Sequence, residues 1–277
     1  MEQKNYENVE QIYELIKNLI MKKVVKLLGF ILLVTFTAKG QEVVMDQMYF
    51  FNNFVGVTAG IGLTSYTGSV SFYADKVDSC VPYSFNSKSG FETNVLFGLR
   101  AELKLHRYWY LYASLLYEER SAKFAPQDYT EHVYVSDAHP FELASFKQEL
   151  SAKVNIFSIT PMIKYRPFNF DFGIFLGPSF AFMVSDELSV KESITEPTEL
   201  FFGDNGKRER TVYSGEIESK NTFLFDLKGG FGYGRMIAEQ IKLSAEIFYV
   251  LPLTKVKSGD DWKISSIQFL VSCSYGF

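Results

Sequence analysis

Residues 94–121, NVLFGLRAELKLHRYWYLYASLLYEERS, decide the fold of this chain. Both halves of the stretch alternate large apolar residues with polar or small ones, and little more than His106 and Arg107 separates them. A period of two is typical of β-strands whose two faces meet different surroundings. The sequence therefore predicts two antiparallel strands joined by a tight turn.

The same alternation recurs in six further segments, which are 54–64, 157–166, 172–182, 223–234, 241–249 and 266–277. Each of the eight strands is long enough to cross a bilayer, for which about 9–11 tilted residues suffice. Short connections (106–107, 167–170 and 237–239) alternate with long ones (65–93, 122–152, 185–221 and 252–263). This layout predicts that 53–277 form an all-β, eight-stranded antiparallel up-and-down transmembrane β-barrel with short periplasmic turns and long external loops. The acidic run within 186–199 is expected to lie in such a solvated loop.

Alternation alone also fits a soluble barrel of the lipocalin type, which has eight strands too. The polar face, however, is rich in Gly, Ser and Thr, as at Gly56, Thr58, Gly60 and Gly62, where a soluble surface would carry more charge. We therefore expect the apolar face to meet lipid. Aromatic residues near the strand ends of that face suit interfacial girdles: Trp109, Tyr117, Tyr165, Tyr233, Tyr249, Tyr275 and Phe277.

Composition narrows the class of protein. The chain has 277 residues, of which 47% are hydrophobic and 22% charged, so it has too much apolar content to remain disordered. A single run approaches a helical membrane span, and it lies near the N-terminus. The formal net charge of −4 argues against binding nucleic acid through bulk electrostatics.

That N-terminal run is predicted to be a secretory signal peptide spanning 21–40. Lys22, Lys23 and Lys26 form its basic region, residues 27–36 its apolar core, and Ala38 to Gly40 a cleavage site before Gln41. Residues 1–20 are interpreted as an upstream leader or a misannotated start, and 41–52 as a short periplasmic segment. The mature chain would carry 22 basic and 28 acidic residues.

Eight strands enclose an interior just wide enough for side chains, so we expect it to be filled. Charges of both signs fall on the inward face, and we expect them to pair, because isolated buried charge is costly. This predicted lumen charge network consists of Arg100, Glu102, Lys104, Glu118, Arg120, Lys164, Arg166, Asp226, Lys228, Lys242 and Glu246.

Three motifs resemble the PorT-type outer-membrane β-barrel family of Bacteroidota, and the resemblance covers the whole mature chain. They are YEERSA at 117–122, FSITPMIKY at 157–165 and GPSF at 177–180, with Thr160 a departure from the family's usual pattern. A signal ending before Gln is also typical of that phylum. The resemblance implies an eight-stranded barrel in the outer membrane. It implies no single activity, although a few members are linked to protein secretion.

Outer-membrane lipid and the barrel-assembly machinery are the expected partners, with Tyr275 and Phe277 as a C-terminal assembly signal. Envelope proteins are expected as further partners, without an identity. No cofactor or metal site is predicted, since no ligand set converges in the sequence.

We predict a non-enzymatic, structural or protein-interaction role in the cell envelope, which includes an accessory role in secretion. One alternative is a pore for small ions or solutes. Another is a lipid-modifying enzyme that uses Ser136, Asp137 and either His132 or His139, all in one external loop.

Cys80 and Cys273 are expected to lie at opposite ends of the barrel, too far apart for a disulfide. Pro161 falls in mid-strand, where it cannot donate a ladder hydrogen bond, so we expect a β-bulge there.

Overall fold

The structure is a computed structural model that describes residues 53–72, 83–86, 91–133, 142–168, 170–203 and 206–277. The predicted leader, signal peptide and periplasmic segment lie outside these residues, and so does Cys80. The strands are β1 (Asn53–Thr67), β2 (Ser69–Phe72), β3 (Tyr83–Asn86), β4 (Glu92–Lys104), β5 (Trp109–Lys123), β6 (Gln127–Val133), β7 (Glu142–Tyr165), β8 (Phe172–Glu196), β9 (Glu209–Gly215), β10 (Phe223–Ala238), β11 (Ile241–Pro252) and β12 (Lys263–Gly276). Among the described residues, no helix combines the length and the apolarity that a membrane span requires.

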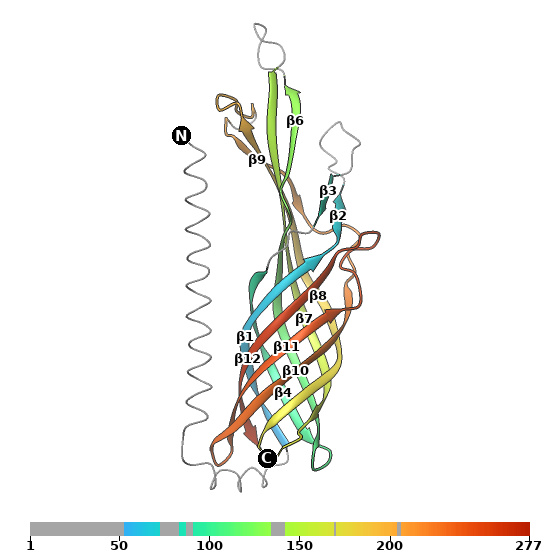
Figure 1. Ribbon diagram of the computed structural model, residues 1–277, viewed down its shortest axis with the longest axis vertical. Coiled ribbons are helices and arrows are strands. Elements are labelled where there is room, and N and C mark those ends of the chain that lie inside the picture. Colours follow the sequence, from blue (N-terminus) through green and yellow to red (C-terminus); the bar gives the residue numbers. More distant parts are fainter. Residues whose placement is uncertain (1–52, 73–82, 87–90, 134–141, 169, 204–205) are drawn as a thin grey trace. The chain divides into compact units, whose positions relative to one another are not determined.

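Eight of these strands form the predicted barrel (Figure 1). In the order β1, β4, β5, β7, β8, β10, β11 and β12, each strand pairs antiparallel with the next, and β12 closes the barrel by pairing with β1. The eight-stranded up-and-down topology is confirmed, and each of the eight predicted segments lies within, or within a residue or two of, one of these strands. Closure leaves no unpaired strand edge to face lipid.

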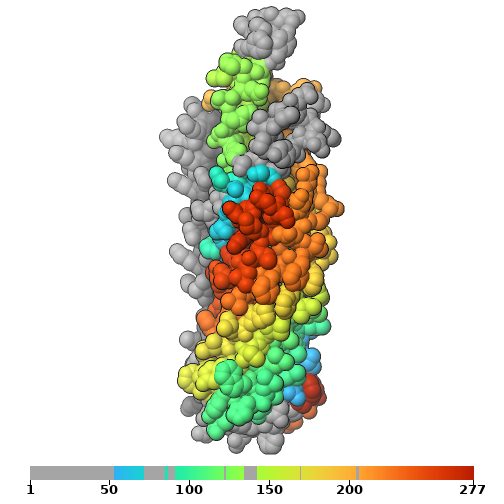
Figure 2. All heavy atoms as spheres, turned by 90° about the vertical axis from the view of Figure 1, so that its right-hand side faces the viewer, coloured from blue at the N-terminus to red at the C-terminus, as the bar shows by residue number. Residues whose placement is uncertain are grey.

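The register of the pairs fixes the stagger of the barrel. Following paired residues across the sheet from Asn53 leads back to β1 at Leu63, ten residues further along. The residues on this path are Asn53, Leu103, Leu111, Ile163, Leu176, Gly229, Tyr249, Ile267 and Leu63. A shear of ten over eight strands tilts each strand by about 40° from the barrel axis. The space-filling view shows this tilt as diagonal bands of colour (Figure 2).

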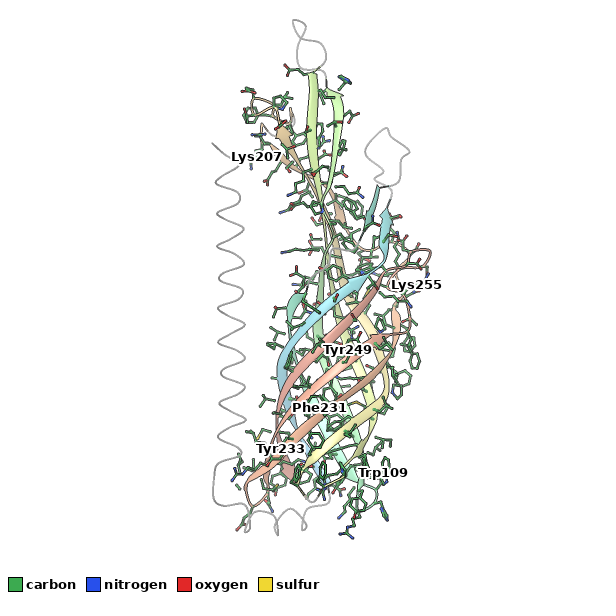
Figure 3. All side chains as sticks on the ribbon, viewed as in Figure 1. Trp109, Lys207, Phe231, Tyr233, Tyr249 and Lys255 are labelled. Atoms are coloured by element: carbon green, nitrogen blue, oxygen red, sulfur yellow. The ribbon has the colours of Figure 1, made fainter. Side chains whose placement is uncertain are left out.

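The apolar face of each barrel strand points outward. On β1, Val55 and Val57 are 49% and 59% exposed, whereas Thr58 and Thr64 point into the barrel and are buried. Outward aromatic residues lie near one end of the apolar band and along its wall. Trp109 and Tyr233 lie near the end with the short turns, and Tyr249 lies further along the wall (Figure 3).

Side chains fill the interior in successive layers. An apolar cluster occupies its middle, where Tyr112 and Phe175 pack edge to face with ring centroids 5.1 Å apart. A larger apolar core lies under the long-loop end, and Phe124 packs there against Trp262 with centroids 5.5 Å apart. Such packing fills the described lumen with side chains at these two levels.

Two of the predicted long loops are in fact extensions of the barrel strands. β7 and β8 continue far beyond the other strands, and β6 and β9 pair with their outer edges (Figure 1). We call β6, β9 and the parts of β7 and β8 that pair with them the external sheet. The prediction of loops over 122–152 and 185–221 is therefore wrong for most of these residues. The acidic run lies mostly in β8 and not in a loop. Glu187, Glu196 and Glu199 are exposed as predicted, whereas Glu192 is buried and Asp186 accepts hydrogen bonds.

The outward side chains of β7 change character partway along the strand. Phe157, Ile159 and Ile163 face outward in the barrel, and they give way to Lys153 and Glu149 in the external part. At the same level, β8 carries an extra residue, Val184, so that Asn155 pairs with Ser185 and the next residue of β7 with Met183. The β-bulge and the change of surface together mark the level at which the strands leave the apolar band.

The predicted bulge at Pro161 is absent. The pairing of β7 with β8 keeps one register from Ile159 to Ile163, and Pro161 pairs in register with Ala113 of β5. That register places Pro161 opposite Pro178, so two residues without an N–H share one place in the ladder. Gly177 permits the close approach, since a Cβ there would lie 2.2 Å from the Pro161 carbonyl oxygen.

Candidate functional site: the charged interior of the barrel

Six inward residues form a cluster near the end of the barrel with the short turns. All are at most 3% exposed, and three cations face three carboxylates: Arg100, Lys164 and Lys242 with Glu102, Asp171 and Glu246. We call this set the lower cluster. The alternation of β4, β7 and β11 aims these side chains inward, and the strand stagger brings residues distant in sequence together.

Glu102 is the centre of the lower cluster. Its carboxylate accepts hydrogen bonds from Arg100 at 3.0 Å, from Lys164 at 3.0 Å and from Lys242 at 2.9 Å. Asp171 accepts from Lys164 at 2.7 Å and lies 3.2 Å from the Lys242 ammonium. Glu246 accepts from Arg100 and, at 3.0 Å, from the Tyr112 hydroxyl. Three cations around one carboxylate satisfy the buried charges that the fold creates.

A second set, the upper cluster, lies beyond the central apolar layer. Arg120 donates to Glu118 at 2.7 Å and to Asp226 at 3.3 Å. The Gln268 amide donates to the other oxygen of Glu118 at 2.7 Å. Arg120 thus meets the pairing expectation of the sequence analysis.

Lys228 does not meet it. Among the described residues no carboxylate lies within ion-pair distance of its Nζ, which lies 4.7 Å from the centre of the Phe248 ring. Arg120 engages both carboxylates of the upper cluster, so Lys228 is stabilised by the ring and by the field of charges around it. Two further predicted members lie at the rim. Lys104 is half-buried, and Arg166 lies over the Tyr110 ring at 5.1 Å.

Sequence reasoning missed three members of these clusters: Asp171, Tyr112 and Gln268. Asp171 had a signal, because it continues the inward alternation of Gly173 and Phe175 by one step into the turn. Tyr112 and Gln268 also fall on inward positions, but a search for charge alone passes over a tyrosine and an amide.

The predicted assembly signal lies at the C-terminal end of β12. Tyr275 and Phe277 point outward and are 50% and 60% exposed. The Phe277 N–H donates to the Asn53 carbonyl at 3.0 Å, which ties the end of β12 to the beginning of β1. Cys273 also points outward, and its thiol is free.

The paired interior is suited to holding the wall together. Its carboxylates are paired with cations, as Glu102 is with Arg100 and Lys164. Within the described ranges no group of His, Cys, Asp and Glu is arranged to hold a metal ion. Of the residues considered for an enzyme, His132 lies exposed on β6, and Ser136, Asp137 and His139 lie outside the described residues.

Several solved structures match this chain at low sequence identity. Solved structures similar to this chain include Ail of Yersinia pestis, at 10% identity over 82% of this chain and 99% of that chain, with a TM-score of 0.30. OprG of Pseudomonas aeruginosa gives 12% identity over 82% and 96% with a TM-score of 0.31. The outer membrane protease OmpT of Escherichia coli gives 12% over 82% and 97% with a TM-score of 0.32. The comparison with curated proteins found no match.

One family model describes most of the barrel. The outer membrane protein beta-barrel domain matches residues 47–258, a span that runs from before β1 to the connection between β11 and β12. An outward apolar band, a closed meander of tilted strands and this match together place the protein in the outer membrane. The chain belongs to the outer membrane protein β-barrel domain family.

Proposed function

We propose that this protein is a non-enzymatic barrel whose external sheet contacts other components of the cell envelope. One observation carries the proposal: the interior is filled with packed side chains, while a four-stranded sheet extends past the apolar band. Closure of the barrel within the membrane requires no ordered structure beyond the lipid. The external sheet therefore provides a surface outside the membrane for contacts with other molecules.

The external sheet has an interior of its own. Glu192 is buried there, and it accepts hydrogen bonds from Tyr129, from Gln148 at 2.9 Å and from Arg210 at 2.8 Å. The Arg210 guanidinium also lies 4.4 Å from the centre of the Phe202 ring. Three partners from β6, β7 and β9 around one buried carboxylate of β8 fix the relative positions of the four strands, which supports a preorganised contact surface.

A truncation tests this proposal. Residues 127–148 begin and end at a paired position, because Gln127 pairs with Gln148, so their removal joins two chain ends that are already adjacent. We expect that crosslinking in intact membranes recovers a reproducible set of envelope proteins with the full chain and loses it with the truncated one. A matched control, His106→Ala in a short turn at the other end, should retain the set. Identical sets from the full and truncated chains would refute the proposal.

The finer assignments are part of the same proposal. We propose that 21–40 are a cleaved signal peptide, that the chain is of the PorT type from Bacteroidota, and that its role includes an accessory one in secretion. Tyr275 and Phe277 are proposed to be recognised by the barrel-assembly machinery. Mass spectrometry of the mature protein tests the first point, since cleavage as proposed leaves Gln41 as the first residue.

The packed interior also bears on the pore alternative. With apolar layers between and beyond the charge clusters, the proposal expects no stable large conductance in planar bilayers. Such a conductance, lost when the protein is heat-unfolded, would replace the contact role with a transport role. Lipid A of unchanged structure in a deletion strain is the corresponding expectation against the enzyme alternative.

A further inference from the structure

The buried charges of the barrel interior do not balance. Among the described residues of the lumen, six cations and five carboxylates are at most 9% exposed. The cations are Arg100, Arg120, Lys164, Arg166, Lys228 and Lys242, and the carboxylates are Glu102, Glu118, Asp171, Asp226 and Glu246. The lower cluster balances three against three. The upper cluster balances if Lys228 is counted with Arg120, so the surplus cation is Arg166.

Arg166 lies at the mouth of the lumen, directly after β7. Its N–H donates to the Tyr108 carbonyl at 2.8 Å, which fixes the backbone, and its guanidinium lies over the Tyr110 ring. The residue is 9% exposed, and its buried Nε has no hydrogen-bond partner among the described residues. No carboxylate of the described residues lies within ion-pair distance of the guanidinium. A guanidinium cannot escape this situation by losing its proton, as an ammonium can.

A second polar group at the same mouth is also unsatisfied. Ser274 pairs in register with Lys242 near the end of β12, and its buried hydroxyl has no partner among the described residues. An unpaired buried donor costs free energy unless water or a ligand engages it. The mouth thus combines a fixed cation with unused donors.

We propose that this mouth, which faces the periplasm, is a binding site for an oxyanion group, a phosphate or a carboxylate, held by Arg166. The planar guanidinium carries two terminal nitrogens side by side, and that edge matches two oxygens of such a group. The group can belong to a small soluble anion or to the headgroup of a lipid, since both present the same oxygens. The proposal does not depend on the external sheet.

Nitrogen-15 NMR of the arginine Nε–Hε groups tests the proposal on the whole mature chain, folded in a phosphate-free maltoside micelle. Inorganic phosphate and then acetate are titrated at constant ionic strength. The signal of Arg166 should shift and saturate in the millimolar range. Arg100 and Arg120 are internal controls, because their Nε atoms also have no partner but their terminal nitrogens are held by carboxylates. Their signals should stay in place.

Variants and a lipid arm complete the experiment. Arg166→Gln should abolish the saturable response, as read from the remaining signals of the mouth, and Arg166→Lys should weaken binding at least tenfold because it loses the paired donors. Reconstitution into phospholipid nanodiscs without free phosphate identifies the source: a shift on reconstitution alone assigns a lipid headgroup, and a shift only on titration assigns a soluble anion. An Arg166 signal that does not move in either arm, that moves without saturating, or that moves together with Arg120 would overturn the proposal.

Discussion

Replacement of Glu102 by glutamine removes the carboxylate that three cations share. Its oxygens accept from Arg100, Lys164 and Lys242 at 2.9–3.0 Å, and all four side chains are at most 3% exposed. The substitution changes the lower cluster from three cations and three carboxylates to three and two, with little change of volume. Breaking a buried pair by removing one partner costs about 3–5 kcal/mol, mostly because the remaining charge stays buried. We expect a loss of unfolding free energy in that range for Glu102→Gln.

The assay is urea unfolding in phospholipid vesicles, followed by tryptophan fluorescence, with the slope against urea checked for constancy. The double variant Glu102→Gln/Lys242→Met restores equal numbers of charges, so it should recover part of the loss, with a coupling of about 1–3 kcal/mol. Glu131→Gln on exposed β6 is the control and should stay within about 0.5 kcal/mol of the parent. A loss below about 1 kcal/mol for Glu102→Gln, or a double variant less stable than the sum of its singles, would refute this reasoning.

Three further predictions concern packing, depth and pH. Gly98→Val should destabilise the barrel by about 1–3 kcal/mol in the same urea assay, because a Cβ at Gly98 would lie 1.9 Å from a carbonyl oxygen of β5; an unchanged midpoint would contradict the close approach. Ile159→Arg should cost about 2–4 kcal/mol, whereas Ser151→Arg on the same face of β7 should cost about 0–1 kcal/mol; equal costs would show that the apolar band is misplaced. Hydrogen bonds to carboxylates, that of Asp186 foremost, raise the pKa of Lys220 above 10.5 in the external region. The stabilisation from that ion pair is therefore present below the ordinary lysine pKa and lost as pH rises through the raised value. Carbon-13 NMR of the lysine side chain should show the pKa of Lys220 fall in Asp186→Asn, and an identical titration in both proteins would exclude the contact.

The barrel could be predicted from the sequence because lipid and lumen impose unlike demands on successive residues. Val55 and Val57 meet lipid while Thr58 lies inside, and the contrast survives along every barrel strand. In the external sheet, the difference in polarity between the two faces is smaller. Its inner face includes Gln148 and Glu192 among apolar residues, so the alternation is blurred, and the extra residue in β8 reverses it midway.

The inward positions of the charged residues follow from the same alternation, but their partners do not. Arg100 and Glu246 are 146 residues apart and meet only because of the stagger between strands. The surroundings of Lys228 could not be predicted either. Nothing in the sequence indicates that Arg120 engages both nearby carboxylates and leaves the lysine to an aromatic ring.

The single extra residue at Val184 has a consequence for how this chain can change. Below it, the even-numbered residues of β8 face the lipid; above it, the alternation is reversed, and Leu188 and Val190 point into the core at the long-loop end. Beyond that core, the alternation of the distal hairpins depends on water and on their own pairing. Insertions, deletions or whole grafted hairpins above that point need not be compensated in the wall. The part of the chain outside the membrane can thus diversify, while the barrel wall, on which membrane insertion depends, remains unchanged.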